Sequence, residues 1–235
     1  MADETDRAVG PTDDAAVPAW RRHTVAEQRW PAALAVLVVI GLQISLPDHL
    51  NLSSRYLLPI IELALLVVLV AANPRRMEST SAPLRLCGLA LIALASLANA
   101  YSAVRIVIDI VTSSSRAGAG ELLLSGATVY LTNVIIFGLW YWELDRGGPV
   151  DRACGVAQYP DLLFPQMTSP PELSPPEWEP RLIDYLYVAY TNATAFSPTD
   201  TMPMTRWAKA AMALQSAVAL ITVAMVLARA INILK

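Results

Sequence analysis

The sequence is poor in the residues from which enzymes build their sites. Only two histidines occur, His23 and His49, and only two cysteines, Cys87 and Cys154. Two cysteines give no disulfide framework, and their positions lack the spacing of a metal site. No Ser/His/Asp set and no glycine-rich phosphate loop is present, so we expect neither an enzyme nor a bound metal or cofactor.

Charge is scarce as well. Charged residues make up 16% of the chain and the net charge is −3, which gives no electrostatic basis for binding nucleic acid. Of the 17 basic residues, 15 are arginine and two are lysine, a skew typical of GC-rich bacterial genomes. Hydrophobic residues reach 55%, and the mean hydropathy is +0.45. This composition is typical of a protein embedded in a lipid bilayer, here the bacterial plasma membrane.

Long apolar runs with few charges predict an all-α, polytopic membrane protein. We expect four transmembrane helices within residues 29–142 and a fifth near the C-terminus. The expected spans are residues 30–46, 55–72, 83–112, 121–142 and 205–234. The cluster Phe137, Trp140, Tyr141 and Trp142 ends the fourth span and indicates a membrane interface.

Two segments carry no such pattern. Residues 1–28 are acidic and contain Gly and Pro but no apolar core, which predicts a disordered N-terminal tail. Residues 143–180 contain eight prolines beside acidic residues, which predicts an extended loop. Within that loop, residues 159–165 are apolar enough to lie against the membrane or the helix bundle.

The last segment, residues 181–235, has an unusual layout. A short aromatic helix is expected at 182–190, followed by a polar turn at 191–200 and then the last span. This layout predicts a re-entrant or interfacial half-helix, because non-helical backbone survives at membrane depth only where protein or water satisfies it. The turn is either a structural connection or a permeation or substrate site, and its candidate residues are Thr191, Asn192, Thr194, Ser197 and Asp200.

Several stretches carry a resemblance to known proteins. The C-terminal part of the chain contains the run from Asp184-Tyr185-Leu186-Tyr187 to Asp200, the sequence Arg206-Trp207-Ala208-Lys209 and the helix to Leu234. These segments resemble the C-terminal region of uncharacterised bacterial integral membrane proteins. An echo of this resemblance occurs at Trp142–Gly148. More distantly, the C-terminal region is similar to the pore-loop element of two-helix potassium channels, whose filter reads Thr-Val-Gly-Tyr-Gly-Asp.

At the comparable place this chain has Thr194-Ala195-Phe196-Ser197-Pro198-Thr199-Asp200. Both glycines of the filter are missing, and Pro198 fixes its own φ. The resemblance therefore implies a pore-loop-like element without a potassium filter.

Three ionisable residues are expected inside the membrane: Glu62, Arg105 and Asp109. Arg105 and Asp109 share a helix face. Because neighbouring spans joined by a short loop pack antiparallel, we expect Glu62 and Arg105 to reach similar depths and to form an ion pair. The cluster is either a polar network that joins helices or a relay for protons or ions.

We therefore expect a channel-like or transporter-like membrane protein for an unspecified small ion or solute. The alternative is a non-transporting scaffold or interaction protein of the cell envelope. A pore loop normally needs several subunits around one axis, so we also expect a homo-oligomer in the lipid bilayer.

Topology is the first testable prediction. With five spans and a cytoplasmic N-terminus, 12 basic residues near the span ends lie inside and four lie outside. Cysteines introduced as Ala15→Cys or Ser79→Cys, in a background without Cys87 and Cys154, should resist an impermeant thiol reagent in intact cells. Labelling at both sites would show that the predicted orientation is wrong and that the N-terminus lies outside. Labelling of Lys235→Cys distinguishes five spans from six, since only five place it outside.

Overall fold

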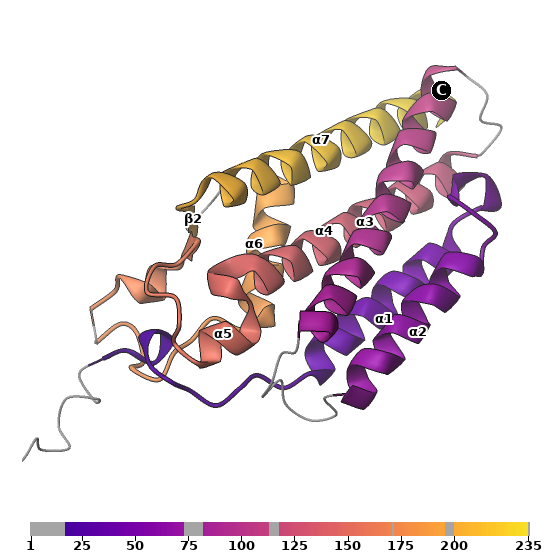
Figure 1. Ribbon diagram of the computed structural model, residues 1–235. Coiled ribbons are helices and arrows are strands. Elements are labelled where there is room, and N and C mark those ends of the chain that lie inside the picture. The colour runs from indigo at the N-terminus through magenta and orange to yellow at the C-terminus, as the bar shows by residue number, and fades with distance from the viewer. Residues whose placement is uncertain (1–16, 73–81, 113–117, 171, 196–199, 235) are drawn as a thin grey trace, which may run out of the picture.

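The computed structural model describes residues 17–72, 82–112, 118–170, 172–195 and 200–234 (Figure 1). The chain is mostly helical. Its six long helices are α1 (Trp30–Ser45), α2 (Leu57–Ala72), α3 (Ala82–Val111), α4 (Ala119–Leu144), α6 (Leu182–Ala195) and α7 (Arg206–Leu234). The short elements between them are η2 (Ala19–Arg21), η3 (Asp48–Leu50), η4 (Asp145–Gly147), α5 (Pro149–Ala153), β1 (Leu162–Leu163), η5 (Pro165–Met167) and β2 (Met202–Pro203).

Among the described residues, three helices are long and apolar enough to cross a membrane: α3, α4 and α7. Helices α1 and α2 are equally apolar but have 16 residues each. At about 1.5 Å per residue they reach about 24 Å, somewhat less than the roughly 30 Å of a hydrocarbon core. The helical fold is thus confirmed, and three of its described helices meet the length and composition for a full span, which is compatible with a multi-pass membrane protein.

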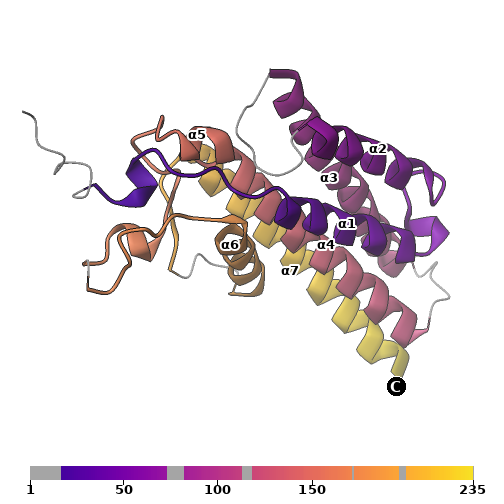
Figure 2. The ribbon, with the colours of Figure 1, turned by 90° about the horizontal axis from the view of Figure 1, so that it is seen from below.

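Helix α4 is the centre of the bundle. It packs against α1, α3, α6 and α7, while α2 packs against α1 and α3 (Figures 1 and 2). Its side chains Val129, Ile136 and Tyr141 are almost fully buried. Helices α1 to α4 alternate in direction, so every connection between them lies at one of the two ends of the bundle. We call the end where α4 stops and α7 begins the loop end, and the end where η3 joins α1 to α2 the hairpin end.

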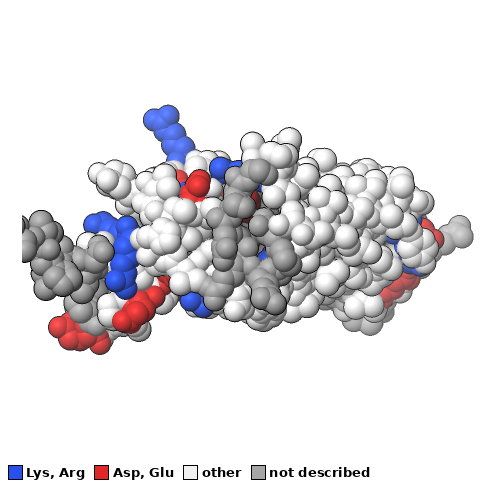
Figure 3. Space-filling view, turned by 60° about the horizontal axis from the view of Figure 1, so that its bottom comes forward, with Lys and Arg blue, Asp and Glu red and all other residues white. Residues whose placement is uncertain are grey.

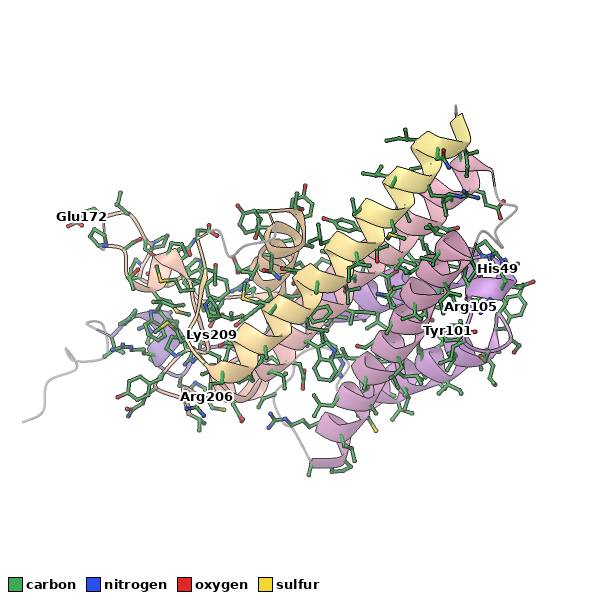
Figure 4. The ribbon with its side chains drawn as sticks, turned by 90° about the horizontal axis from the view of Figure 1, so that it is seen from above. His49, Tyr101, Arg105, Glu172, Arg206 and Lys209 are labelled. Atoms are coloured by element: carbon green, nitrogen blue, oxygen red, sulfur yellow. The ribbon has the colours of Figure 1, made fainter. Side chains whose placement is uncertain are left out.

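On the face seen in Figure 3, charged side chains gather toward the two ends and few lie between them. Large hydrophobic side chains such as Leu37, Val67 and Leu97 are exposed along the helices. The side chains of Arg206 and Lys209 lie at the loop end, and those of His49 and Arg105 lie at the hairpin end (Figure 4). An apolar surface between two polar ends is what a lipid environment requires.

Two glycines of α4 allow neighbouring helices to approach closely. A Cβ on Gly138 would lie 2.7 Å from the Leu186 side chain and 3.1 Å from its Cα in α6. A Cβ on Gly126 would lie 2.8 Å from the Val226 side chain in α7. The missing side chains thus set the distance between α4 and both C-terminal helices.

The loop end is more ordered than the sequence predicts. In the expected extended loop, β1 pairs with β2 antiparallel, joining Leu162 to Pro203 and Leu163 to Met202. Phe164 is buried, and its ring packs edge-on against Tyr185, with the centroids 5.3 Å apart. Of the two positions expected for residues 159–165, the bundle holds for Leu162 and Phe164, whereas Tyr159 is 83% exposed. The proline spacing alone could not show that these apolar side chains hold the loop in place.

The expected N-terminal tail also needs correction. Residues 1–16 lie outside the described part of the chain, but residues 17–28 run along the loop end and contact it. The Ala19 amide donates to the Pro176 carbonyl (3.0 Å), and the Thr24 amide donates to the Ala153 carbonyl (2.8 Å). Trp20 is only 5% exposed. A low-hydropathy segment becomes ordered here because its few apolar and polar groups find partners far along the chain.

The contact at Gly138 gives a stability prediction. Gly138→Val places a branched side chain against the α6 backbone, which cannot rotate away, and should lower the free energy of unfolding by about 1–3 kcal/mol. The measurement is thermal unfolding of the purified protein in mild detergent. Gly41→Val is the matched control, because nothing lies within 4 Å of a Cβ on Gly41. Equal losses for the two variants would show that the α4–α6 contact is not tight.

Candidate functional site

Helix α6 is a half-length helix that packs antiparallel along α4. Its 14 residues reach about 21 Å, too short to cross a bilayer. Near its start, Leu186 faces Gly138 of α4. Near its end, the Thr194 and Tyr130 hydroxyls are 3.0 Å apart. Tyr130 lies 14 residues before the end of α4, about 21 Å away, so α6 ends about halfway along its neighbour.

A buried amide network fixes the inner face of α6. The Gln215 Oε1 of α7 accepts hydrogen bonds from the Tyr141 hydroxyl (2.7 Å) and from Asn192 Nδ2 (2.8 Å). The Gln215 Nε2 donates to the Ala189 carbonyl (2.8 Å), and Asn192 Nδ2 also donates to the Met212 carbonyl (3.0 Å). Tyr141, Asn192 and Gln215 are at most 1% exposed. This network joins α4, α6 and α7.

Two further bonds extend the network along α7. Asn133 Nδ2 of α4 donates to the Gln215 carbonyl (3.3 Å), and the Ser216 hydroxyl donates to the Asn192 carbonyl (3.1 Å). Each side-chain amide nitrogen in the network thus has an acceptor, as buried polar groups require.

The expected polar turn begins later than the sequence indicates. Residues Thr191 to Ala195 belong to α6. The Thr191 hydroxyl donates to the Tyr187 carbonyl (3.0 Å), and the Thr194 hydroxyl donates to the Tyr190 carbonyl (2.7 Å). These bonds let threonine continue a helix, and the burial of Asn192 against α7 overrides its weak helix propensity.

The five candidate residues therefore do not form one turn. Asn192 points into the protein, whereas Thr194 is exposed at the end of α6. Asp200 is exposed and lies two residues before β2. Ser197 lies outside the described residues.

A second polar cluster, at the loop end, surrounds the buried carboxylate of Asp145. Its Oδ1 accepts from the backbone amides of Asp161 (2.9 Å) and Leu162 (3.2 Å), and its Oδ2 accepts from the Tyr185 hydroxyl (2.5 Å). Asp145 and Tyr185 are both 0% exposed. The Arg152 guanidinium lies 4.9 Å from the centroid of the Tyr185 ring, where its charge balances the carboxylate. Asp145 thus ties α4 to β1 and α6.

The backbone after α4 has an unusual conformation that explains its sequence. Arg146, Gly147 and Gly148 have φ values of 53°, 84° and 101°. A Cβ on Gly148 would lie 2.9 Å from the Glu143 carbonyl oxygen. Adjacent glycines serve this left-handed turn because side-chain-bearing residues resist it. The Trp142–Gly148 stretch, noted above only as an echo of a family, therefore folds the chain back over Asp145.

The Asp161 carboxylate extends this cluster to α7. Its Oδ2 accepts from the Arg146 amide (2.8 Å), and its Oδ1 accepts from Trp207 Nε1 (2.9 Å). The start of α7 is thereby fixed to the same turn that ends α4.

Glu27 makes long-range contacts that the sequence did not reveal. Its carboxylate accepts from Trp142 Nε1 (2.7 Å) and from the Leu182 amide (2.9 Å) at the beginning of α6. A carboxylate is favourable at a helix N-terminus. No local signal identifies this residue, because its partners lie 115 and 155 residues away.

The expected charge cluster is divided in the structure. Arg105 pairs with Asp109 (3.5 Å), and His49 also approaches Asp109 (3.7 Å). Glu62 instead accepts a hydrogen bond from Gln43 Nε2 of α1 (3.1 Å). Between described residues there is no Glu62–Arg105 ion pair, so the expected pairing is wrong. Similar expected depths along the helices were not enough to bring the two side chains together. Glu62 faces α1, whereas Arg105 pairs with Asp109, one turn away on its own helix.

Comparison with family models, characterised proteins and solved structures finds no match to this chain. Among the described residues, no group of three or more His, Cys, Asp or Glu side chains is arranged to hold a metal ion. What the two clusters can do follows from their geometry: they hold the half-length helix α6 at a fixed position along α4.

The Asp145 cluster gives the next prediction. Tyr185→Phe removes the hydroxyl from a fully buried carboxylate and should lower the free energy of unfolding by about 1–3 kcal/mol. Tyr187→Phe is the control, since Tyr187 is 54% exposed and should change stability little. Thermal unfolding in detergent measures both. If Tyr185→Phe left the free energy of unfolding unchanged, the Asp145 carboxylate would not depend on α6 for its stabilisation.

Proposed function

We propose that this chain is a bacterial plasma-membrane protein with five spans and a half-inserted α6, and that several copies form a channel-like passage for small ions or polar solutes. The alternating directions of α1 to α4 support five crossings, with α1 and α2 as a short antiparallel hairpin. The halfway end of α6 supports its insertion without crossing. The N-terminus, the loop end and the start of α7 then share the cytoplasmic side.

The observation that carries the proposal is the exposed hydroxyl pair at the end of α6. Thr194 is exposed and Tyr130 is only half-buried, although they meet about halfway along α4. Hydroxyls and the ends of interrupted helices at membrane depth need protein or water around them. A single chain leaves this surface uncovered, so neighbouring subunits around a water-filled axis would satisfy it.

The chemistry of the site fits cations and small polar molecules. The last carbonyls of a helix carry partial negative charge, and half-helix ends of this kind coordinate cations in transporters. Thr194, Tyr130 and the exposed Tyr190 add hydroxyl groups at the same place. This arrangement is similar to a pore-loop element, with side-chain hydroxyls in place of a glycine filter.

One observation favours the alternative of a non-transporting scaffold. Asn192 and Gln215, the polar residues buried between α6 and α7, direct their side-chain amide groups to partners within the same chain. A network of this kind joins helices and leaves no polar path through one subunit. A scaffold would therefore be a monomer, or an oligomer without conductance.

Flux through liposomes separates the two functions. The purified protein should pass small cations above the background of empty vesicles and should form an oligomer in mild detergent. Thr194→Val and Tyr130→Phe should each lower the flux severalfold, because they remove hydroxyls from the passage. Thr168→Val, in an exposed loop-end turn, is the control. A monomer with no flux would favour the scaffold.

Selectivity tests the absence of a filter. If the passage conducts, we expect little preference for potassium over sodium, because no glycine-based backbone presents carbonyl rings to the ion. The reversal potential under a potassium–sodium gradient measures this preference. Strong potassium selectivity would contradict the proposed side-chain lining.

A further inference from the structure

Glu62 is the most deeply buried acid of the hairpin end. It lies five residues into α2, faces α1, and is 0% exposed. One carboxyl oxygen, Oε1, accepts from Gln43 Nε2. The other, Oε2, is buried without any hydrogen-bond partner. A carboxyl that served only to join two helices would use both oxygens.

The charged groups around Glu62 are engaged elsewhere. On η3 and the connection that leads to α2, Asp48 and Arg55 pair with each other (3.3 Å). On α3, Arg105 and Asp109 form an ion pair, which His49 approaches from η3. Helix α1 contributes the neutral Gln43. No described Arg, Lys or His lies within ion-pair distance of Glu62.

A small cavity at the hairpin end lies beside Gln43, the hydrogen-bond partner of this carboxyl, although Glu62 itself does not line it. It has a volume of about 10 Å³, close to the space that one water molecule needs. Its polar lining consists of Gln43, Asn51, Ser53, Ser54, Arg55 and Ser102. Gln43 belongs both to this cavity and to the Glu62 hydrogen bond. A water in the cavity would therefore stand next to the residue that holds the carboxyl.

From this geometry we propose that Glu62 is a proton-binding site, which takes up and releases a proton at the hairpin end. A buried carboxylate without a counter-charge is costly, so the group binds a proton and becomes neutral. In the neutral acid, Gln43 donates to the carbonyl oxygen, and Oε2 carries the exchangeable proton. The site requires no conduction through α6 and stands apart from the function proposed above.

Carbodiimide labelling tests the proposal on the full-length protein in lipid vesicles. Dicyclohexylcarbodiimide is apolar and reacts with protonated carboxyls: the acid proton moves to a reagent nitrogen, the carboxylate oxygen adds to the central carbon, and the product rearranges to a stable N-acylurea. Mass spectrometry should find this adduct on Glu62. Above its midpoint, the labelling rate should fall about tenfold for each pH unit, as expected for one titrating proton.

Three variants sharpen the test. Glu62→Gln should lose the adduct and keep the melting temperature, because the amide preserves the shape. Gln43→Leu removes the donor that stabilises the carboxylate and should move the labelling midpoint to higher pH. A purely structural role would not produce that shift. Glu121→Gln is the control, since Glu121 is an exposed acid at the same end of the bundle.

The proposal is overturned if Glu62 in the wild-type protein stays unlabelled at every pH while Glu121 reacts. It is equally overturned if the labelling rate at Glu62 itself does not change with pH. Both readouts come from the wild-type protein, so they hold even where a variant fails to fold.

Discussion

The structure depends on one constraint: α6 ends halfway along α4, and the polar groups that it buries must be satisfied by the chain itself. Gln215 meets this constraint on one side of α6, where its amide joins Tyr141, Asn192 and Ala189. At the loop end Asp145 meets it through the Tyr185 hydroxyl and the backbone of β1. Breaking either contact would leave a buried polar atom unpaired, which costs more than the bond itself contributes.

Helix α4 can carry both contacts because its sequence changes along its length. Glycines at 126 and 138 let α7 and α6 approach closely. Tyr141 and Trp142 then reach outward with a hydroxyl and an indole nitrogen to Gln215 and Glu27. Beyond the helix end, the turn of Arg146, Gly147 and Gly148 reverses the chain so that Asp161 meets both Arg146 and Trp207. Helix α4 thus packs closely against its neighbours at its glycines and makes polar contacts with them near its C-terminal end.

The sequence predicted the long helices well because apolar periodicity and length are local properties. It anticipated the Gly–Gly stretch after α4 only as a family echo, although two adjacent glycines after a helix favour a left-handed turn. It failed at Glu27 and at the extension of α6 through Thr194, because both depend on partners more than 20 residues away. The Glu62–Arg105 pairing failed for a related reason: depth follows from counting residues, but the direction a side chain faces depends on how the helices pack.

The two faces of α6 have opposite properties, and this difference locates any passage. The inner face is closed, since Asn192 and Gln215 direct their amides to groups within the same chain. The outer face ends in the exposed Thr194 beside Tyr130. Water or ions that moved between α4 and α7 would have to displace buried hydrogen bonds, whereas on the outer face they would meet hydroxyl groups that are already accessible. Any passage therefore lies outside the single chain, where a second copy would face α6.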